Sequence, residues 1–177
     1  IPGKDAVRHI KKEIGLKKGE RLVVVTTGGG GDGYRVMDTY LTALERYRSS
    51  LPFKSVLITG PFMPKLARRD VFKRARKLGL RTYHFYRQME KIFAAADIVV
   101  SMGGYNTLCE ILGQGTLSLV IPRETPRQEQ ILRARAFHRQ NLVDYIPWDD
   151  FSPALLHEKL IALLQNSEPY HEAISRF

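Results

Sequence analysis

Two glycine-rich segments, each directly after an apolar run, are the clearest candidates for chemistry in this sequence. The first covers residues 28–33 and follows the β-branched run 22–27. The second covers 103–107 (Gly-Gly-Tyr-Asn-Thr) and follows the apolar run 96–100. A strand that ends at glycines and re-emerges as a helix brings backbone N–H groups and the positive end of a helix dipole close to a ligand. Both segments therefore predict the binding of an anion such as phosphate.

The first glycine segment, which includes Gly29, Gly30 and Gly31, matches neither of two common nucleotide motifs. It lacks the Lys-Ser/Thr pair of a P-loop. The Gly-x-Gly-x-x-Gly spacing read from Gly28 also lacks the acidic residue that a dinucleotide site has at the end of its second strand. A plain strand-to-helix turn is the structural alternative, although four consecutive glycines cost more chain entropy than such a turn requires.

The elements that must position these segments alternate along the chain. Near-continuous apolar runs predict strands, and helical spacing of apolar residues predicts helices between them. Predicted strands cover 22–27, 55–59, 81–85, 97–101, 117–121 and 143–146, and predicted helices cover 36–47, 66–78, 89–95, 107–112, 128–139 and 153–164. This alternation predicts an α/β fold, a Rossmann-like parallel sheet with helices on both faces. Both glycine segments and the loop after residue 121 then lie at strand carboxyl ends, where such sheets bind ligands.

The composition and net charge of the chain indicate which classes of binding partner are favoured. The chain has 177 residues, enough for one domain, and 28 Lys and Arg against 18 Asp and Glu give a net charge of +10. The basic residues concentrate in 4–21, 65–81 and 123–139. The middle cluster predicts either a solvated helix face or contact with anionic lipid headgroups. Nucleic acid is not favoured, because no RNA-recognition or helix-turn-helix signature accompanies these clusters.

The sequence does not indicate a membrane-spanning, disulfide-bonded or metal-binding protein. No apolar run approaches the roughly 20 residues that span a bilayer, so a soluble protein is expected. The only cysteine, Cys109, cannot form an internal disulfide, which fits the cytoplasm, and its place on an apolar helix stripe predicts a core position. The five histidines are scattered, so no metal site is expected.

The segments 101–112 and 121–130 together resemble the nucleotide-sugar half of a GT-B glycosyltransferase, the family 28 C-terminal domain. The resemblance implies the C-terminal half of a GT-B fold. The chain is expected to comprise a linker with a short N-terminal helix (1–21), a nucleotide-sugar-binding domain (22–165) and a polar C-terminal tail (166–177). The resemblance also implies roles for individual residues. Donor-binding residues would be Gly29, Gly30 and Gly31 near the phosphates, Phe85 and Tyr86 at the uracil, Gly103, Gly104, Asn106 and Thr107 in the phosphate turn, Glu110 at the ribose, and Arg127, Gln128 and Glu129 at the sugar.

Structural alternatives stay open for several of these residues. Thr107 and Glu110 have the spacing of a capping box, in which the threonine caps a helix and the glutamate bonds back to it. Phe85 and Tyr86 could pack into the core at a strand end. Residues 127–130 match the family's segment near the donor sugar, but they could equally be a polar helix start. Glu129 stands where the family usually has a second glutamine, which leaves the identity of the sugar open.

The resemblance implies transfer of a hexose-type sugar from a nucleotide diphosphate sugar, UDP-N-acetylglucosamine or a related donor, to an acceptor hydroxyl. No cofactor or metal is expected, and no catalytic residue is identified. The partners implied are an N-terminal acceptor-binding domain or separate chain and a lipid-phosphate acceptor, at the cytoplasmic, inner face of the membrane. The chain alone is expected to be inactive. A UDP-N-acetylglucosamine 2-epimerase and a non-catalytic nucleotide-binding module remain as alternatives.

Overall fold

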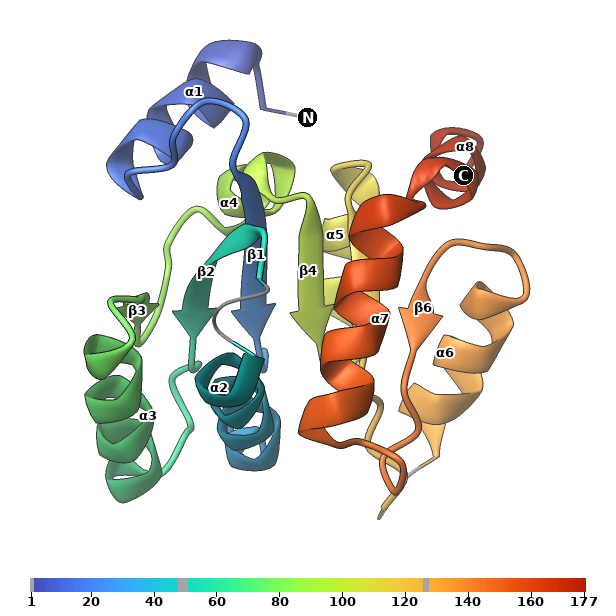
Figure 1. Ribbon diagram of the computed structural model, residues 1–177. Coiled ribbons are helices and arrows are strands. Elements are labelled where there is room, and N and C mark those ends of the chain that lie inside the picture. The colour runs from blue at the N-terminus through green and yellow to red at the C-terminus, as the bar shows by residue number, and fades with distance from the viewer. Residues whose placement is uncertain (1, 48–50, 126–127) are drawn as a thin grey trace.

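The computed structural model describes residues 2–47, 51–125 and 128–177, in which helices and strands alternate along most of the chain (Figure 1). The predicted α/β class is confirmed. The elements are α1 (Lys4–Glu13), β1 (Arg21–Thr26), α2 (Tyr34–Tyr47), β2 (Phe53–Ile58), α3 (Lys65–Lys77), β3 (Arg81–Tyr83), α4 (Met89–Ala95), β4 (Ile98–Ser101), α5 (Tyr105–Gly113), β5 (Leu117–Val120), α6 (Glu129–His138), β6 (Asp144–Tyr145), α7 (Pro153–Gln165) and α8 (Glu168–Ser175).

The sheet has six strands in the order β3-β2-β1-β4-β5-β6, and every neighbouring pair is parallel. Helices α2, α3 and α7 cover one face, and α4 and α5 lie behind the other (Figure 1). Because β1 and β4 are neighbours although they are not consecutive in the chain, the strand order reverses between them. All strands point the same way, so their carboxyl ends and the following loops gather at one edge of the sheet.

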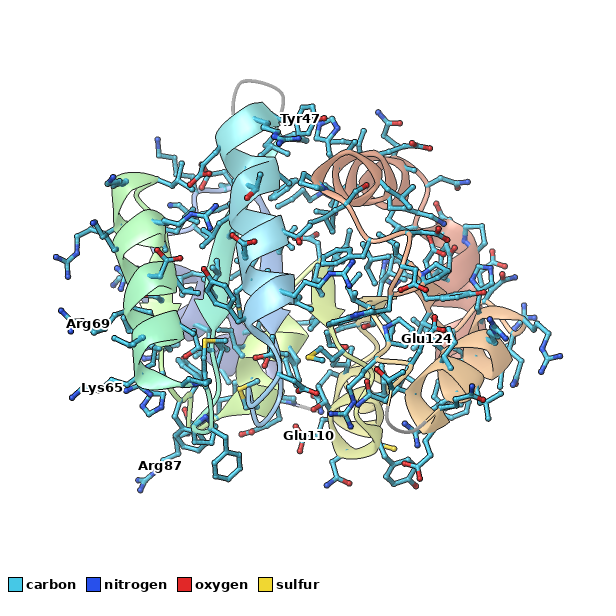
Figure 2. All side chains as sticks on the ribbon, turned by 90° about the horizontal axis from the view of Figure 1, so that it is seen from below. Tyr47, Lys65, Arg69, Arg87, Glu110 and Glu124 are labelled. Carbon is cyan, nitrogen blue, oxygen red and sulfur yellow. The ribbon has the colours of Figure 1, made fainter. Side chains whose placement is uncertain are left out.

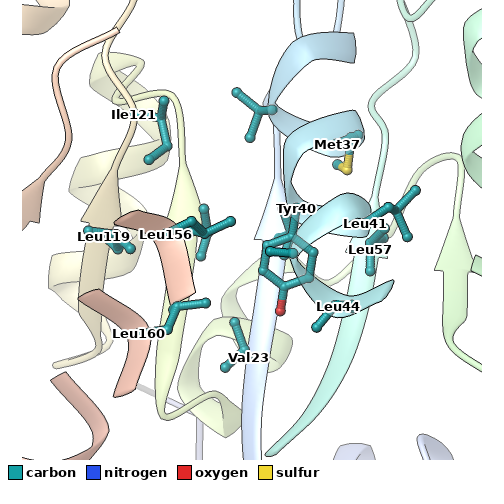
Figure 3. Close-up of a cluster of buried hydrophobic side chains, with 14 of the residues drawn as sticks. Val23, Met37, Tyr40, Leu41, Leu44, Leu57, Leu119, Ile121, Leu156 and Leu160 are labelled. Carbon is teal, nitrogen blue, oxygen red and sulfur yellow. The ribbon is translucent and has the colours of Figure 1, made fainter. Parts of the chain in front are cut away.

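The first hydrophobic layer explains why the central strands are almost wholly apolar. Val23, Leu57 and Leu119 point from three strands toward helices α2 and α7, and all three are fully buried (Figure 3). Tyr40 of α2 lies in the same layer, where its hydroxyl pairs with the Ser55 hydroxyl at 2.8 Å. Parallel strands that are covered on both sides need apolar side chains on both faces, as this sheet shows.

The second layer ties both ends of the described chain to the domain. Ile10 of α1 and Ile174 of α8 are buried in the same cluster as the α4 residue Ile92. The segment 166–177, expected only as a polar tail, thus contains a helix with one apolar residue in the core. The division of the chain into a domain with two flanking segments stays a prediction.

Two local expectations about α5 are wrong. The helix begins at Tyr105, two residues before the expected start, so Thr107 lies inside the first turn and Gly104 occupies the cap position. Cys109 is exposed rather than buried. The helix directs Leu108, Ile111 and Leu112 into the core, and residue 109 falls on the solvent side of that stripe.

Candidate nucleotide-binding site

The candidate site lies at the carboxyl edge of the sheet, where the strand order reverses between β1 and β4. The loop after β1 leads to α2 on one face, and the loop after β4 leads to α5 on the other. The two loops therefore diverge and leave a crevice between them, which is the usual position of a ligand in an open parallel sheet. Figure 2 views the molecule from this edge, with Glu110 of α5 in the lower middle of the view.

The first glycine loop is fixed mainly by backbone contacts. Gly30 has a φ of +84°, and an added Cβ would lie 2.1 Å from the carbonyl oxygen of Thr59. The Phe62 N–H donates to the Gly29 carbonyl at 2.7 Å, and the Thr27 hydroxyl donates to the Thr59 carbonyl at 2.9 Å. The loop thus needs glycine at position 30 both for its backbone conformation and for its close approach to the turn after β2.

The second glycine turn prepares the start of α5. Gly103 has a φ of +77°, and an added Cβ would lie 2.7 Å from Cγ1 of Val120. Its carbonyl accepts a hydrogen bond from Nη1 of Arg133 at 3.0 Å. The first hydrogen bond of the helix runs from the Leu108 N–H to the Gly104 carbonyl at 3.0 Å. The N–H groups before it have no carbonyl partner within the helix, so they and the helix dipole favour an anion here.

A cavity of about 360 Å³ lies between the two loops, and we call it the glycine-loop cavity. Among the sequence-predicted residues it brings together Gly29, Gly30, Gly31, Gly104, Asn106 and Thr107; its other lining residues are Thr27, Gly28, Asp32, Met102, Tyr105, Arg123 and Gln130. Gly103 is buried behind the cavity and does not line it. Backbone groups and short polar side chains dominate the walls, as a phosphate site requires.

A second cavity, of about 160 Å³, adjoins the first, and we call it the aromatic cavity. Its lining includes the predicted residues Phe85, Tyr86 and Glu110. Gly28 and Thr107 line both cavities, so the two are continuous in position. The structure therefore brings the expected base, ribose and phosphate residues to one place, although they come from three separate segments.

The aromatic cavity depends on a contact with α1. The Tyr86 hydroxyl donates to Glu13 at 3.4 Å, the Tyr83 hydroxyl donates to the same carboxylate at 3.3 Å, and the two rings meet edge to face. Burial raises the pKa of Tyr86 to about 12, and the nearby Glu13 carboxylate adds to the shift. Phe85 is 63% exposed at the mouth of the cavity, so it is not a core residue.

Glu110 stands one turn inside α5, on the side of the aromatic cavity. The capping-box alternative for this residue fails, because the helix begins before Thr107 and the cap position carries no side-chain hydrogen bond. Within the described part of the chain, the Glu110 carboxylate has no hydrogen bond or ion pair. It is exposed and directed to the cavity edge, where it could accept hydrogen bonds from a ligand.

The loop between β5 and α6 departs most from expectation. Arg127 lies outside the described residues. Gln128 precedes α6 and Glu129 begins it. Both are exposed, and neither lines the glycine-loop cavity or the aromatic cavity. Gln130 lines the glycine-loop cavity instead, and its Oε1 accepts the Arg123 N–H at 2.9 Å.

The sequence did not single out Asp32, Tyr105 and Arg123 as ligand contacts, and it indicated Gln130 only as the last residue of the segment 127–130. Asp32 is the only charged residue in the first glycine run, and Arg123 follows the fifth strand almost directly, so both carried a usable signal. In the described ranges there is no group of three or more His, Cys, Asp or Glu that could hold a metal. None of the helices formed by these residues is both long and apolar enough to cross a bilayer.

Comparison with solved structures identifies the class of fold. The calicheamicin glycosyltransferase CalG4 superposes with a TM-score of 0.69 at 16% identity, covering 91% of this chain and 38% of that protein. MurG of Acinetobacter baumannii superposes with a TM-score of 0.68 at 16% identity, covering 93% and 46%. At these identities the similarity establishes a shared fold, a Rossmann-like α/β domain.

Sequence comparison identifies the family. The glycosyltransferase family 28 C-terminal domain matches residues 6–176, and the chain belongs to this family. Relatives include the UDP-N-acetylglucosamine–N-acetylmuramyl-(pentapeptide) pyrophosphoryl-undecaprenol N-acetylglucosamine transferases of Acetivibrio thermocellus and Streptococcus pneumoniae. The first is 27% identical over 158 residues, and the second is 28% identical over 152 residues. These matches cover 88% and 85% of this chain, but only 42% and 41% of the relatives' length.

Proposed function

We propose that this chain is the donor-binding part of a glycosyltransferase and that it binds a UDP-sugar, UDP-N-acetylglucosamine or a close relative. The observation that carries the proposal is the junction of the two cavities at Gly28 and Thr107. An apolar cavity suits a nucleobase, and the adjoining cavity offers backbone N–H groups to a diphosphate. The family membership and the donor named for the relatives agree with this assignment.

In this proposal each segment contacts one part of the donor. Phe85 and Tyr86 contact the uracil, Glu110 accepts hydrogen bonds from the ribose hydroxyls, and the first turn of α5 binds the diphosphate. The reaction is displacement of the nucleotide diphosphate by an acceptor hydroxyl. Negative charge grows on the departing diphosphate, so the N-terminus of α5 stabilises the leaving group more as the bond breaks.

Binding of UDP to the purified chain tests the donor site. We expect an affinity in the micromolar to millimolar range, on the order of 4 to 8 kcal/mol. Isothermal calorimetry and thermal shift would measure it, with uridine and ADP as ligands that lack the diphosphate or the uracil. Absence of heat and of a thermal shift at millimolar UDP, on protein with a cooperative melt, would remove the donor-site assignment.

The acceptor and the catalytic base are proposed to belong to another domain or chain. Near-attack positioning of acceptor and donor can contribute roughly 7 to 11 kcal/mol. The two carboxylates that line the cavities among the described residues have other assignments, because Asp32 pairs with Arg123 and Glu110 is assigned to the ribose. We therefore expect no sugar transfer by the isolated chain. Incubation with UDP-N-acetylglucosamine and analysis of the products by NMR would also detect the 2-epimer, which has the same mass as the substrate and is the product expected of the epimerase alternative.

We further propose that α3 faces an anionic surface. The helix contains seven basic residues and one acidic residue. Arg74 forms ion pairs with Asp38 and Glu45. Lys65 and Arg69 instead project outward, near the same edge of the molecule as Arg87 (Figure 2). Two exposed apolar residues, Phe62 (75%) and Leu66 (78%), accompany them. A basic, partly apolar surface is suited to anionic lipid headgroups, with about 1 kcal/mol expected per basic residue.

Vesicle co-sedimentation tests the proposed binding of α3 to an anionic lipid surface. The chain is expected to bind vesicles that contain phosphatidylglycerol and not pure phosphatidylcholine, and Arg69→Glu is expected to weaken binding. Arg135→Glu, an equal change of charge at an exposed position on α6, is the matched control. Equal loss of binding in the two variants would mean that only net charge matters, and preference for a nucleic acid duplex over the vesicles would contradict a lipid partner.

A further inference from the structure

The glycine-loop cavity contains two charged lining residues in the part of the chain that the structure describes, and these two are paired with each other. Nη1 of Arg123, from the loop after β5, donates to Oδ2 of Asp32, from the loop after β1. The two residues are 91 positions apart in the sequence. The pair therefore joins two loops across the cavity and leaves the charged lining residues with no net formal charge.

Arg123 keeps donor capacity that this pair does not use. Its backbone N–H is held by Gln130, which fixes the base of the side chain. Its Nε is buried and has no hydrogen-bond partner among the described residues. The side chain as a whole is 34% exposed, so the guanidinium remains within reach of a ligand. A planar guanidinium with one occupied and several free N–H groups is well suited to a phosphate or carboxylate.

The position of the pair indicates which part of a nucleotide would meet it. Arg123 and Asp32 line the glycine-loop cavity and not the aromatic cavity, whereas Gly28 and Thr107 line both. A nucleotide with its base in the aromatic cavity passes Gly28 and Thr107 first. The phosphate nearest the ribose then meets the junction and the start of α5, and the terminal phosphate extends into the part of the cavity that holds Arg123.

We propose that Asp32 and Arg123 form a self-occupied anion subsite for the terminal phosphate of a nucleoside diphosphate. Asp32 holds the guanidinium while the cavity is empty, and the incoming phosphate displaces the carboxylate from it. This inference rests on the proposed donor site. It adds that the Asp32 carboxylate competes with the terminal phosphate for the guanidinium of Arg123. Since the carboxylate occupies Nη1 of Arg123 and repels the phosphate, Asp32 lowers the affinity for the diphosphate.

Titration of three ligands, uridine, UMP and UDP, against two variants of the full 177-residue chain tests the subsite. Arg123→Gln is expected to weaken UDP binding about tenfold or more, since it removes a charge-assisted hydrogen bond. Asp32→Asn is expected to tighten UDP binding roughly three- to tenfold, since it frees the guanidinium. Binding of uridine and UMP is expected to change little in either variant, because neither ligand carries the second phosphate.

Matched controls separate this effect from a change in overall charge. Arg8→Gln and Asp5→Asn alter an exposed ion pair on α1 by the same charges, and both are expected to leave UDP binding unchanged. Arg123→Lys keeps the charge without the planar fork and is expected to lie between the wild type and Arg123→Gln. Melting curves of each variant confirm that the fold is retained before its affinity is compared.

The outcomes are distinct. Weaker UDP binding by Asp32→Asn would show that Asp32 orients Arg123 rather than competing for it, and the proposal would be wrong. Equal UDP affinity of wild type and Arg123→Gln would exclude Arg123 from the phosphate site while leaving the donor site intact. If folded wild-type protein bound none of the three ligands, the proposed function would fail, and the subsite with it.

Discussion

The glycine-loop cavity and the aromatic cavity adjoin each other but are built in different ways. The first is shaped largely by backbone, with Gly30 pressed against the Thr59 carbonyl and Gly104 at the start of α5. The second is shaped by side chains, and Tyr86 is held by a carboxylate from α1, 73 residues away in the sequence. Backbone packing tolerates few substitutions, whereas a wall of side chains can be altered gradually. This difference predicts large effects at the glycines and small ones at the aromatic residues.

The largest effect is expected for Gly30→Ala. The substitution forces a non-glycine residue to a φ of +84° and places Cβ 2.1 Å from the Thr59 carbonyl oxygen. Backbone strain and overlap together predict a loss of about 2 to 4 kcal/mol of unfolding free energy. Gly31→Ala is the matched control, because an added Cβ there meets no atom within 4 Å. Urea unfolding that gave equal losses for the two variants would show that the loop is not held by backbone contact.

The next effect is expected at the junction of the cavities. Glu110→Gln is expected to weaken UDP binding by about 1 to 3 kcal/mol, because a carboxylate accepts stronger hydrogen bonds from ribose hydroxyls than an amide does. Stability is expected to stay nearly constant, since Glu110 caps no helix. Glu124→Gln, at the same edge but lining neither cavity, is the control (Figure 2). Unchanged UDP affinity in Glu110→Gln would remove the ribose contact.

What could be predicted from the sequence follows the same division. The strand and helix alternation, the Rossmann-like class and the place of the glycine loops were all evident, because apolar runs and consecutive glycines are local signals. The pair of Arg123 with Asp32 and the contact of Tyr86 with Glu13 were not evident, because each joins segments far apart in the sequence. Such contacts depend on how the loops pack, which no local pattern records.

Errors in local detail have a similar cause. The capping preference of Thr107 predicts that α5 begins at residue 107, whereas the helix begins at Tyr105 with Gly104 in the cap position. Helix α8 was missed because its sequence is mostly polar, and one buried residue, Ile174, secures it to the core. In both places tertiary packing decides against the local preference.

A smaller effect would decide which glutamine contacts the ligand. Gln130 lines the glycine-loop cavity and accepts the Arg123 N–H, whereas Gln128 is exposed before α6 and lines neither cavity. Gln130→Ala is expected to weaken binding of a UDP-sugar by about 1 kcal/mol, a typical net value for a hydrogen bond. Gln128→Ala is expected to leave it unchanged. The reverse result, measured by calorimetry with UDP-N-acetylglucosamine, would support the residue that the family resemblance first indicated.

The smallest effect is expected for Tyr86→Phe, which keeps the ring of the aromatic cavity and removes its hydrogen bond to Glu13. At pH 8 the loss of unfolding free energy is expected to stay below about 1 kcal/mol, because the contact is long and partly exposed.

The effect of Tyr86→Phe should depend on pH. The pKa of Tyr86 is raised to about 12 in the folded protein, chiefly by burial, from an ordinary value near 10. A raised pKa means that the stabilisation by this hydroxyl is fully present below pH of about 10 and is lost as the pH rises toward 12. The unfolding free energy of the wild type should therefore fall relative to that of the variant over that interval, while the other tyrosines, present in both proteins, cancel from the difference. A difference that stayed constant from pH 8 to pH 12 would show that Glu13 and burial do not shift this group, and that α1 does not set the wall of the cavity.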